Sequence, residues 1–342
     1  MTAVLPAMRL GCDTKFCDLH PAINSCGLSL SRCGMLRAFF VGLSENATLR
    51  SFAERSSLGN RFSSRFVAGT EISDAVRATQ AINRGGMSVT IDNLGENVTN
   101  PDEARHSAQL YRQILDAIVA NNLNANISLK LTHMGLDVDE KLAREIVSGL
   151  VAKAASMKPP SFVRVDMEGS PYTQRTLDFV HELHRMAGNA NAVGTVIQAY
   201  LKRSESDIEK LLAERIRIRL CKGAYKEPPE IAFAAKSDVD ANYVKLMKVL
   251  MKSGIYHGLA THDENIIRQA EAFARREKIS PDSFEFQMLY GIRRDLQQSL
   301  VRHGWRVRVY IPFGSEWYPY FMRRLGERPA NVFFVLRNFL RA

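Results

Sequence analysis

The sequence predicts an α/β fold: a (β/α)8 TIM-like barrel with N-terminal helices and a C-terminal helix that covers the substrate. Three observations indicate this fold. Eight short β-branched or apolar runs recur from residue 88 onward, stretches with helical spacing separate them, and the chain has about the length of such barrels. A doubly wound open sheet is the alternative, but no run is followed by the glycine fingerprint that such a sheet uses to bind a dinucleotide.

The chain is expected to divide into three parts. Residues 1–34 show little periodicity and are expected to form a poorly structured extension, or to precede a true translation start at Met35. Residues 35–87 are expected to be helical, with one helix start capped near Ser73. The barrel is expected over residues 88–342, so that 35–342 form a single domain. The expected strands are 88–94, 126–131, 162–167, 193–200, 217–223, 256–262, 284–289 and 306–313.

Composition narrows the class of protein. The 342 residues carry a formal charge of +10, which permits nucleic acid, an anionic membrane surface or acidic ligands as partners. No recognition-helix, RRM or zinc-finger signature is present, so we expect no nucleic acid. No apolar run reaches the length of a membrane-spanning helix, and Cys221 is the only cysteine after residue 33, which indicates a cytoplasmic protein.

Alternate residues of each barrel strand face the interior, and polar side chains occupy these positions here. In "NISLKLT", apolar Ile127 and Leu129 suit the helix-facing side, which turns Ser128 and Lys130 inward. The same alternation predicts inward side chains on the other strands: Arg164, Asp166, Gln198, Arg217, Arg219, Glu285, Gln287, Arg308 and Tyr310. Such side chains are rarely buried unless they are paired or serve a ligand.

These inward residues separate into two groups by their height in the barrel. We expect structural ion pairs at the floor from Arg164, Arg217, Glu285 and Arg308. We expect functional roles for the residues near the carboxyl ends of the strands, where barrel enzymes hold their active sites: Lys130, Asp166, Gln198, Arg219 and Tyr310.

The loops that follow the strands add further candidates. Lys222, Gly223 and Ala224 follow the fifth strand, where glycine permits close approach of the backbone to a phosphate or a ring. Thr261 and His262 follow the sixth strand and suit hydrogen bonding to a phosphate. The histidines do not group with carboxylates at metal-ligand spacing, and no G-x-S-x-G elbow is present, so we expect neither a metal nor a hydrolytic nucleophile.

The segment "YPYFMRRLGERP" predicts an anion-binding helix face. At about 100° per residue, Tyr320, Arg323, Arg324 and Glu327 share one face, while Phe321 and its apolar neighbours face the barrel. Two adjacent guanidiniums oriented by a glutamate can hold a small carboxylate by paired hydrogen bonds. A solvated ion pair between Glu327 and Arg323 is the alternative.

From about residue 36 onward the chain resembles the proline dehydrogenase family, especially its short monofunctional bacterial members. The resemblance is carried by motifs in matching order: "LKLT", "VRVDME", "VIQAYLKR", "RLCKGAYKEP", "ATHD", "FEFQMLYG" and "WYPYFMRRLGERP". It implies FAD-dependent oxidation of L-proline to Δ1-pyrroline-5-carboxylate, with hydride passing from proline C5 to flavin N5. It also implies a membrane quinone as electron acceptor, a downstream pyrroline-5-carboxylate dehydrogenase, and transient association with the inner face of the cell membrane.

The resemblance also implies residue roles. It assigns catalytic roles to Asp166, Arg219 and Tyr310, and substrate binding to Lys130, Arg323, Arg324, Tyr320 and Glu327. It assigns FAD contacts to Met167, Gln198, Arg219, Lys222, Gly223, Ala224, Thr261 and His262.

One departure concerns a gate over the site. Family members commonly have Ala-Gly-Glu-Thr before the first strand, whereas this chain has Ala68-Gly69-Thr70-Glu71. Either Glu71 closes the site from a shifted position or Glu96, in "DNLGEN", serves alone. Two other classes stay open: a different flavin barrel similar to methylenetetrahydrofolate reductase, and a non-catalytic barrel that binds an amino acid or a flavin.

Overall fold

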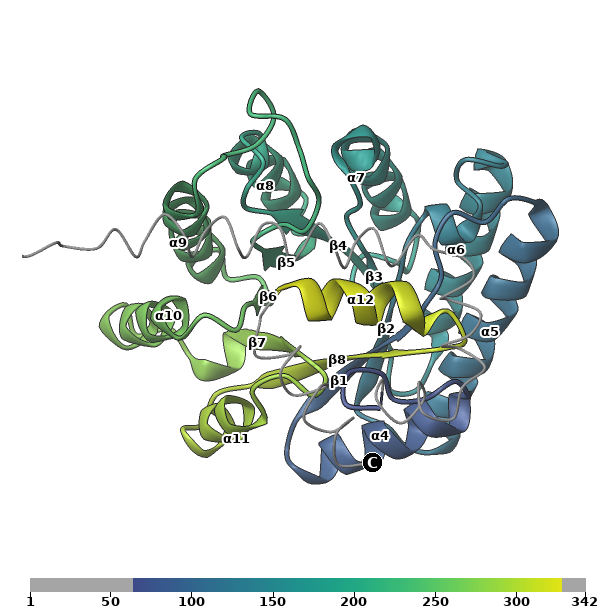
Figure 1. Cartoon of the computed structure of the whole chain (residues 1–342), viewed down its shortest axis with the longest axis horizontal. Helices are drawn as coiled ribbons and strands as arrows, with labels where there is room; N and C mark the ends of the chain where they lie inside the picture. The colour runs from purple at the N-terminus through teal and green to yellow at the C-terminus, as the bar shows by residue number, and fades with distance from the viewer. Residues whose placement is uncertain (1–63, 328–342) are drawn as a thin grey trace, which may run out of the picture.

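The computed structural model describes residues 64–327 and, within this range, the side chains up to Met322. Eight parallel strands pair in chain order, and β1 pairs with β8 to close the barrel (Figure 1). The strands are β1 Ser88–Asn93, β2 Ala125–Leu129, β3 Val163–Val165, β4 Val193–Gln198, β5 Arg217–Cys221, β6 His257–Ala260, β7 Phe284–Leu289 and β8 Val307–Phe313. The predicted barrel is therefore confirmed. The expected extension 1–34 and the expected helices before residue 64 lie outside the described residues.

Helices surround the barrel and connect its strands (Figure 1). They are α4 Ile72–Arg84, α5 Pro101–Ala120, α6 Glu140–Ser156, α7 Ser170–Arg185, α8 Ser204–Ala213, α9 Lys236–Lys252, α10 Glu264–Arg276, α11 Arg294–Arg302 and α12 Trp317–Glu327, with short 3-10 turns η1 Thr132–Met134 and η2 Pro281–Ser283. Over the described range, no helix combines the length and the hydropathy that crossing a bilayer requires.

Local sequence explains where these helices begin. Asn100 accepts hydrogen bonds from the backbone N–H groups of Asp102 and Glu103, and Pro101 occupies the first turn of α5. The start of α4 differs from our expectation of a cap near Ser73. Glu71 is the N-cap, and it forms a reciprocal capping box with Asp74 because a carboxylate can accept the free N–H groups of the first turn.

The apolar core lies between the strands and the surrounding helices. Ile127, Leu129 and Val163 are fully buried, as are the α5 residues Tyr111 and Leu115 on the face that packs inward. Burial of this face of each strand confirms the alternation predicted from sequence, and it turns the polar residues between them toward the barrel axis.

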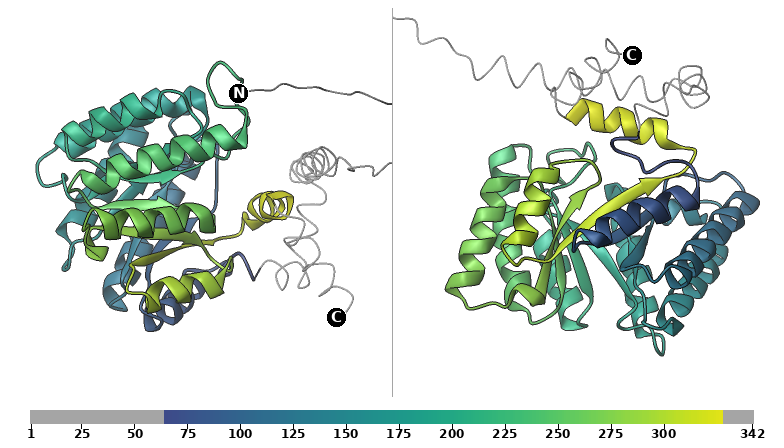
Figure 2. Two further views of the ribbon diagram at one scale, coloured as in Figure 1. Left: turned by 90° about the vertical axis from the view of Figure 1, so that its left-hand side faces the viewer. Right: turned by 90° about the horizontal axis from the view of Figure 1, so that it is seen from below.

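Helix α12 lies across the end of the barrel at which β8 ends, which is the carboxyl end of the parallel strands (Figures 1 and 2). Aromatic side chains attach it there. A second apolar cluster joins α12 to the segment before α4 and to the end of β1, and its buried members are Phe66, Val67, Leu94, Trp317, Tyr318, Tyr320 and Phe321. The helix therefore covers the end where barrel active sites lie.

The barrel floor holds one of the ion pairs expected there. Arg308 Nε lies 2.6 Å from Glu285 Oε1, and the hydroxyl of Tyr256 donates to Glu285 Oε2 at 2.8 Å. Burial acts to raise the pKa of Glu285, but the guanidinium of Arg308 and these donors hold it below its ordinary value.

The other two floor arginines correct our expectation of ion pairs. Arg164 Nη1 donates to the backbone carbonyls of Thr195 and Arg217 at 3.0 and 2.8 Å. The guanidinium of Arg217 lies 4.5 and 4.9 Å from the ring centroids of Phe162 and Tyr256. Among the described residues, the three guanidiniums at the floor share one carboxylate, that of Glu285, so carbonyl oxygens and ring faces stabilise the remaining two.

The Arg308–Glu285 pair gives a stability prediction. Arg308→Met should lower the free energy of unfolding by about 3 kcal/mol or more, because it leaves Glu285 buried without its guanidinium. Urea denaturation of the purified protein measures this change. The matched control is Arg306→Met, two residues earlier, whose exposed pair with Asp282 should contribute less than about 1 kcal/mol. Equal losses in the two variants would contradict the prediction.

Candidate active site

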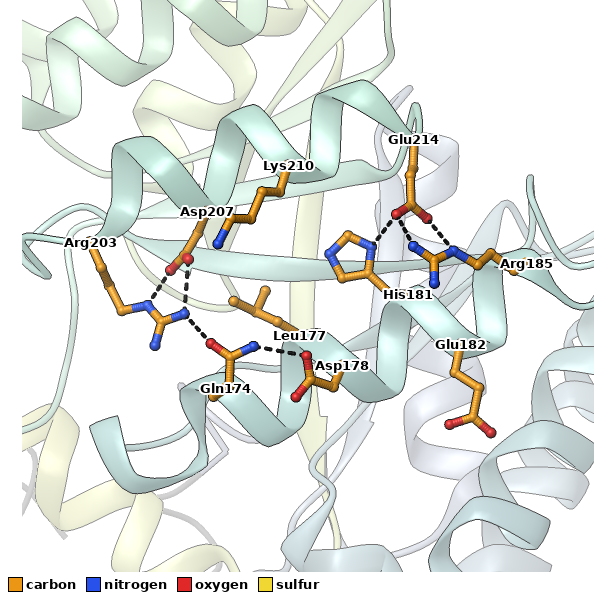
Figure 3. A pocket seen from close by; sticks show the side chains of 10 residues that line it. All are labelled: Gln174, Leu177, Asp178, His181, Glu182, Arg185, Arg203, Asp207, Lys210 and Glu214. Atoms are coloured by element: carbon orange, nitrogen blue, oxygen red, sulfur yellow. Dashed lines mark hydrogen bonds and ion pairs between the residues drawn. The ribbon is translucent and has the colours of Figure 1, made fainter.

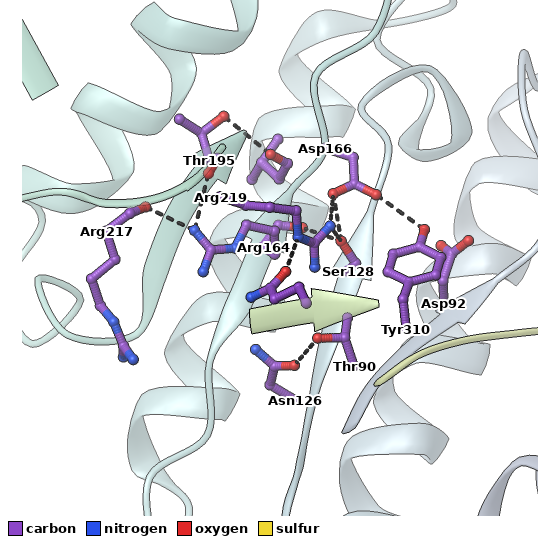
Figure 4. Close-up of polar contacts among 12 residues, drawn as sticks. Thr90, Asp92, Asn126, Ser128, Arg164, Asp166, Thr195, Arg217, Arg219 and Tyr310 are labelled. Carbon is purple, nitrogen blue, oxygen red and sulfur yellow. Dashed lines mark hydrogen bonds and ion pairs between the residues drawn. The ribbon is translucent and has the colours of Figure 1, made fainter. Parts of the chain in front are cut away.

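Asp166, directly after β3, is the centre of the polar side chains at the carboxyl end of the barrel. Its Oδ1 accepts hydrogen bonds from Ser128 Oγ at 2.6 Å and from Arg219 Nη1 at 2.8 Å. Its Oδ2 accepts one from the hydroxyl of Tyr310 at 3.1 Å. The donors come from β2, β5 and β8 (Figure 4), so one carboxylate connects four strands across the barrel interior.

Arg219 is fixed on two sides by this arrangement. Its Nε donates to Gln287 Oε1 at 2.6 Å, and its guanidinium carbon lies 5.2 Å from the ring centroid of Tyr310. Gly258 makes room for Gln287, since a side chain at this position would collide with the amide. The third nitrogen, Nη2, is buried and has no hydrogen-bond partner within the described part of the chain. A buried donor without an acceptor is costly unless a ligand satisfies it.

Lys130, just past β2, supplies a second cation at the mouth. Its Nζ lies 3.6 Å from Glu96 Oε1, and its side chain is 13% exposed. Burial acts to lower the pKa of Lys130, but the carboxylates of Asp92, Glu96 and Asp166 outweigh it and keep this pKa above the ordinary value. The amine therefore stays charged, and it can bind an anion.

Asp92, near the end of β1, has a perturbed carboxyl group. Burial raises its pKa to about 6, and the attraction of Lys130 offsets only part of this effect, while Asp166 adds to it. Asp92 was absent from our predicted site, although alternation along β1 places it on the same side as Thr90, whose buried hydroxyl donates to Asn126 Oδ1. Glu168, which follows β3, was also missed. It is buried, and its carboxylate accepts hydrogen bonds from the N–H and hydroxyl of Thr132.

The loops after β4 and β5 form one wall of the mouth. Gln198 Nε2 donates to the carbonyl of Glu168 at 3.0 Å, and its Oε1 accepts the N–H of Ala224 at 3.3 Å. Gly223 has φ +125°, and a side chain there would collide with the ring of Tyr200. Only glycine fits this conformation without strain, so the loop can lie close to a planar ring or a phosphate.

The remaining cofactor candidates lie after β3, β5 and β6. Lys222 Nζ bridges two carboxylates, at 2.5 Å from Asp240 and 2.9 Å from Asp263. The hydroxyl of Thr261 accepts the N–H of Asp263, and His262 Nε2 accepts the N–H of Leu289 at 2.9 Å. Met167 is buried directly after Asp166. These side chains therefore follow the ends of β3, β5 and β6.

The other candidates are not all at the mouth. Glu71 is exposed and occupied as the cap of α4, whereas Glu96 contacts Lys130. Tyr320 is buried in the aromatic cluster beneath α12. The side chains of Arg323, Arg324 and Glu327 lie outside the described residues.

A groove of about 410 Å³ lies away from this site, between α7 and α8 (Figure 3). Its charges mostly pair with one another. Arg203 binds Asp207 and Gln174, while Glu214 binds His181 and Arg185. Most charged groups of this groove already form ion pairs and hydrogen bonds with one another. We therefore place the functional site at the barrel mouth, where Nη2 of Arg219 is a hydrogen-bond donor without an acceptor among the described residues.

The mouth can therefore bind an anion and a planar group. Lys130 and Arg219 supply positive charge, Gly223 permits close approach, and Asp166 fixes the geometry between them. No group of three or more metal-ligating side chains occurs within residues 64–322.

Comparison with protein families and curated sequences identifies relatives. The proline dehydrogenase family model matches residues 75–337. Proline dehydrogenase 1 of Bacillus subtilis (strain 168) is 41% identical over 308 residues, which cover 90% of this chain and 100% of that protein. Proline dehydrogenase of Deinococcus radiodurans is 41% identical over 280 residues, which cover 81% and 89% of the two chains.

Crystal structures with the same fold are larger proteins. Proline utilization A of Bdellovibrio bacteriovorus, inactivated by N-propargylglycine, aligns with a TM-score of 0.74 at 23% identity, over 86% of this chain and 36% of its own. The D779Y mutant from Bradyrhizobium japonicum aligns with a TM-score of 0.68 at 23% identity, over 79% and 31%. This chain spans about a third of their length, and at these identities the likeness concerns the fold.

Asp92 gives a pH-dependent stability prediction. Its folded pKa of about 6 exceeds the ordinary value, so its contribution to stability is fully present below the unfolded pKa and is lost as pH rises through 6. Relative to Asp92→Asn, the native protein should lose about 1 kcal/mol of unfolding free energy between pH 5 and pH 8. Urea denaturation at both pH values measures this loss. Asp102→Asn, which removes an exposed carboxylate, is the control. A pH-independent difference between native protein and Asp92→Asn would contradict the prediction.

Proposed function

The chain belongs to the proline dehydrogenase family, and from this premise we propose that it oxidises L-proline to Δ1-pyrroline-5-carboxylate with FAD bound at the barrel mouth. The observation that carries the proposal is the Asp166–Arg219 pair, which holds a buried and unsatisfied guanidinium N–H at the carboxyl end of the strands. A flavin ring, rich in nitrogen and oxygen acceptors, is a suitable partner for such a donor.

The residues at the mouth fit a flavin. Arg219 Nη2 supplies a donor for a ring heteroatom, and Gly223 lets the backbone lie against a ring or a phosphate. We propose contacts from the other cofactor candidates as well: Met167, Gln198, Lys222, Ala224, Thr261 and His262. When bound, the flavin accepts the hydride that leaves proline C5, and the electrons then pass to a quinone.

We propose that cations clamp the carboxylate of proline. Lys130 is charged, and it is buried enough for an ion pair with a substrate carboxylate to be strong. Arg323 and Arg324 on α12, with Glu327 orienting them, complete this clamp in our proposal. The supporting observation is that α12 lies over the carboxyl end of the barrel. Tyr310 and Tyr320 would bound the substrate ring.

The chain's own groups then stabilise the charge that the reaction creates. Loss of a hydride from C5 leaves positive charge on the C5–nitrogen unit of the substrate. Asp166, whose position is fixed by three donors, offers a preorganised negative charge near this unit. The same carboxylate also keeps Arg219 and Tyr310 from rotating, so that little reorganisation is needed during the reaction.

The gate and the electron acceptor are finer parts of the proposal. We propose Glu96 as the gate, since it contacts Lys130 while Glu71 is engaged as a helix cap. A membrane quinone is the proposed acceptor, and the formal charge of +10 would favour transient binding to an anionic membrane surface. The product would pass to a pyrroline-5-carboxylate dehydrogenase.

The proposed function predicts a yellow protein that bleaches. Anaerobic addition of L-proline should reduce the bound flavin and abolish its visible absorption, and a soluble quinone should restore it. Cyclopentanecarboxylate, which has a methylene group in place of the ring nitrogen, should leave the flavin oxidised. Flavin that stays oxidised with L-proline would overturn the proposal and would favour a different flavin barrel or a non-catalytic one.

The carboxylate clamp predicts a selective loss of substrate affinity. Lys130→Met and Arg324→Met should each raise the KM for proline at least tenfold, because each removes a charge-assisted contact of about 1.5–3 kcal/mol. The ratio of flavin to protein should stay unchanged, which steady-state kinetics and absorbance measure together. An unchanged KM in either variant would count against that residue.

A further inference from the structure

Asp92 is a buried carboxylate at the barrel mouth without a counterion of its own. It is 1% exposed and makes no ion pair with any residue that the structure describes. It lies beside Asp166, since both carboxylates are within hydrogen-bonding reach of the Tyr310 hydroxyl. In Figure 4, Tyr310 and Asp92 lie together on one side of Asp166.

The hydrogen-bond donors around Asp92 are used elsewhere. Tyr111 has one hydroxyl proton and three acceptors: the carbonyl of Ser128 at 2.8 Å, Asp92 Oδ1 at 3.2 Å and the carbonyl of Asn93 at 3.4 Å. The shortest of these contacts points to Ser128 as the main acceptor. Tyr310 donates its single proton to Asp166. Asp92 therefore has no donor to itself, which favours its protonated form.

The neighbouring carboxylates differ from Asp92 in their hydrogen bonds and ion pairs. Asp166 receives three hydrogen bonds, one of them from a guanidinium. Glu168 receives both donors of Thr132. Glu96 is 31% exposed and lies opposite the ammonium group of Lys130. Asp92 thus differs from these neighbours, because it is fully buried and, among the described residues, has neither a paired cation nor a donor that serves it alone.

The proposed reaction needs such a group. Free proline carries a protonated ring nitrogen at neutral pH, while hydride leaves C5 from the neutral amine. Resting on the proposed function, we propose that Asp92 is the acceptor of this proton, reached through the hydroxyl of Tyr310. The Tyr310 hydroxyl turns from Asp166 to Asp92, which also lies within its reach, and gives its proton to Asp92 as the tyrosine oxygen takes the proton of the amine, so that the amine and the carboxylate both become neutral. Burial disfavours the charged amine and the charged carboxylate alike, so it favours transfer of the proton from the amine to Asp92.

The titratable and charged groups around Asp92 are consistent with this role. They come from α5, β8, the ends of β2 and β3, and the loop after β1: Tyr111, Tyr310, Lys130, Asp166 and Glu96. With a pKa of about 6, Asp92 is ionised at neutral pH before substrate arrives, which suits a proton acceptor.

The test is the pH profile of kcat/KM for flavin reduction by L-proline, measured by anaerobic stopped flow on the flavin-loaded enzyme. For the native enzyme, kcat/KM should rise up to about pH 6 and then stay constant through neutral pH. Asp92→Asn and Tyr310→Phe must use the scarce neutral amine, so at pH 7 they should be at least about 10²-fold slower. Their rates should then rise tenfold per pH unit toward basic pH. Asp282→Asn, which removes an exposed carboxylate outside the site, should keep the native shape of the profile.

Three readouts separate the possible results. Flavin content and the Kd of cyclopentanecarboxylate, which has no amine, should be the same in all variants, so an altered slope cannot come from a damaged site. A native-shaped profile in Asp92→Asn or in Tyr310→Phe would overturn the proton transfer and leave the proposed function intact. If native enzyme is not bleached by L-proline at all, the proposed function fails and this inference fails with it.

Discussion

Charges buried inside a barrel must be compensated by the barrel's own residues, and the Asp166–Arg219 pair meets this constraint at the site. One carboxylate satisfies donors from β2, β5 and β8, so its position depends on the register of those strands. In turn, the tyrosine and the arginine that bound the mouth depend on the carboxylate. The geometry of the site therefore depends on correct closure of the barrel, because the same hydrogen bonds contribute to both.

The floor and the mouth meet the constraint to different extents. At the floor, Glu285 has its guanidinium, and the surplus arginines rest on carbonyls and ring faces. At the mouth, Arg219 keeps an unused donor and Asp92 keeps an unneutralised carboxyl. Stable folding accounts for the first arrangement. The second one costs free energy in the ligand-free chain, which is typical of a site that binds and transforms a ligand.

The sequence predicts the fold well because period-two alternation reports burial directly. Seven of the eight expected strands contain an observed one, and β2 begins one residue earlier than expected, at Ala125. The inward positions of Asp166, Arg219 and Tyr310 follow from the same pattern. The sequence pattern does not predict which side chains contact one another inside the barrel. The pattern does not say that Arg217 stacks between two rings, since Phe162 and Tyr256 approach it from other strand ends. The elevated pKa of Asp92 depends on how many acceptors compete for the proton of Tyr111, and the cap at Glu71 depends on loop geometry.

Gln287 connects the two halves of the interior in a particular way. Its Oε1 accepts from Arg219 at the mouth, and its Nε2 donates to Glu285 at the floor, in the space that Gly258 leaves open. An amide transmits hydrogen bonding but neither gains nor loses a proton near neutral pH. Gln287 therefore does not pass protons between the mouth and the floor. Protonation changes at the mouth stay there, and the carboxylate that supports the barrel from below keeps its charge throughout a catalytic cycle.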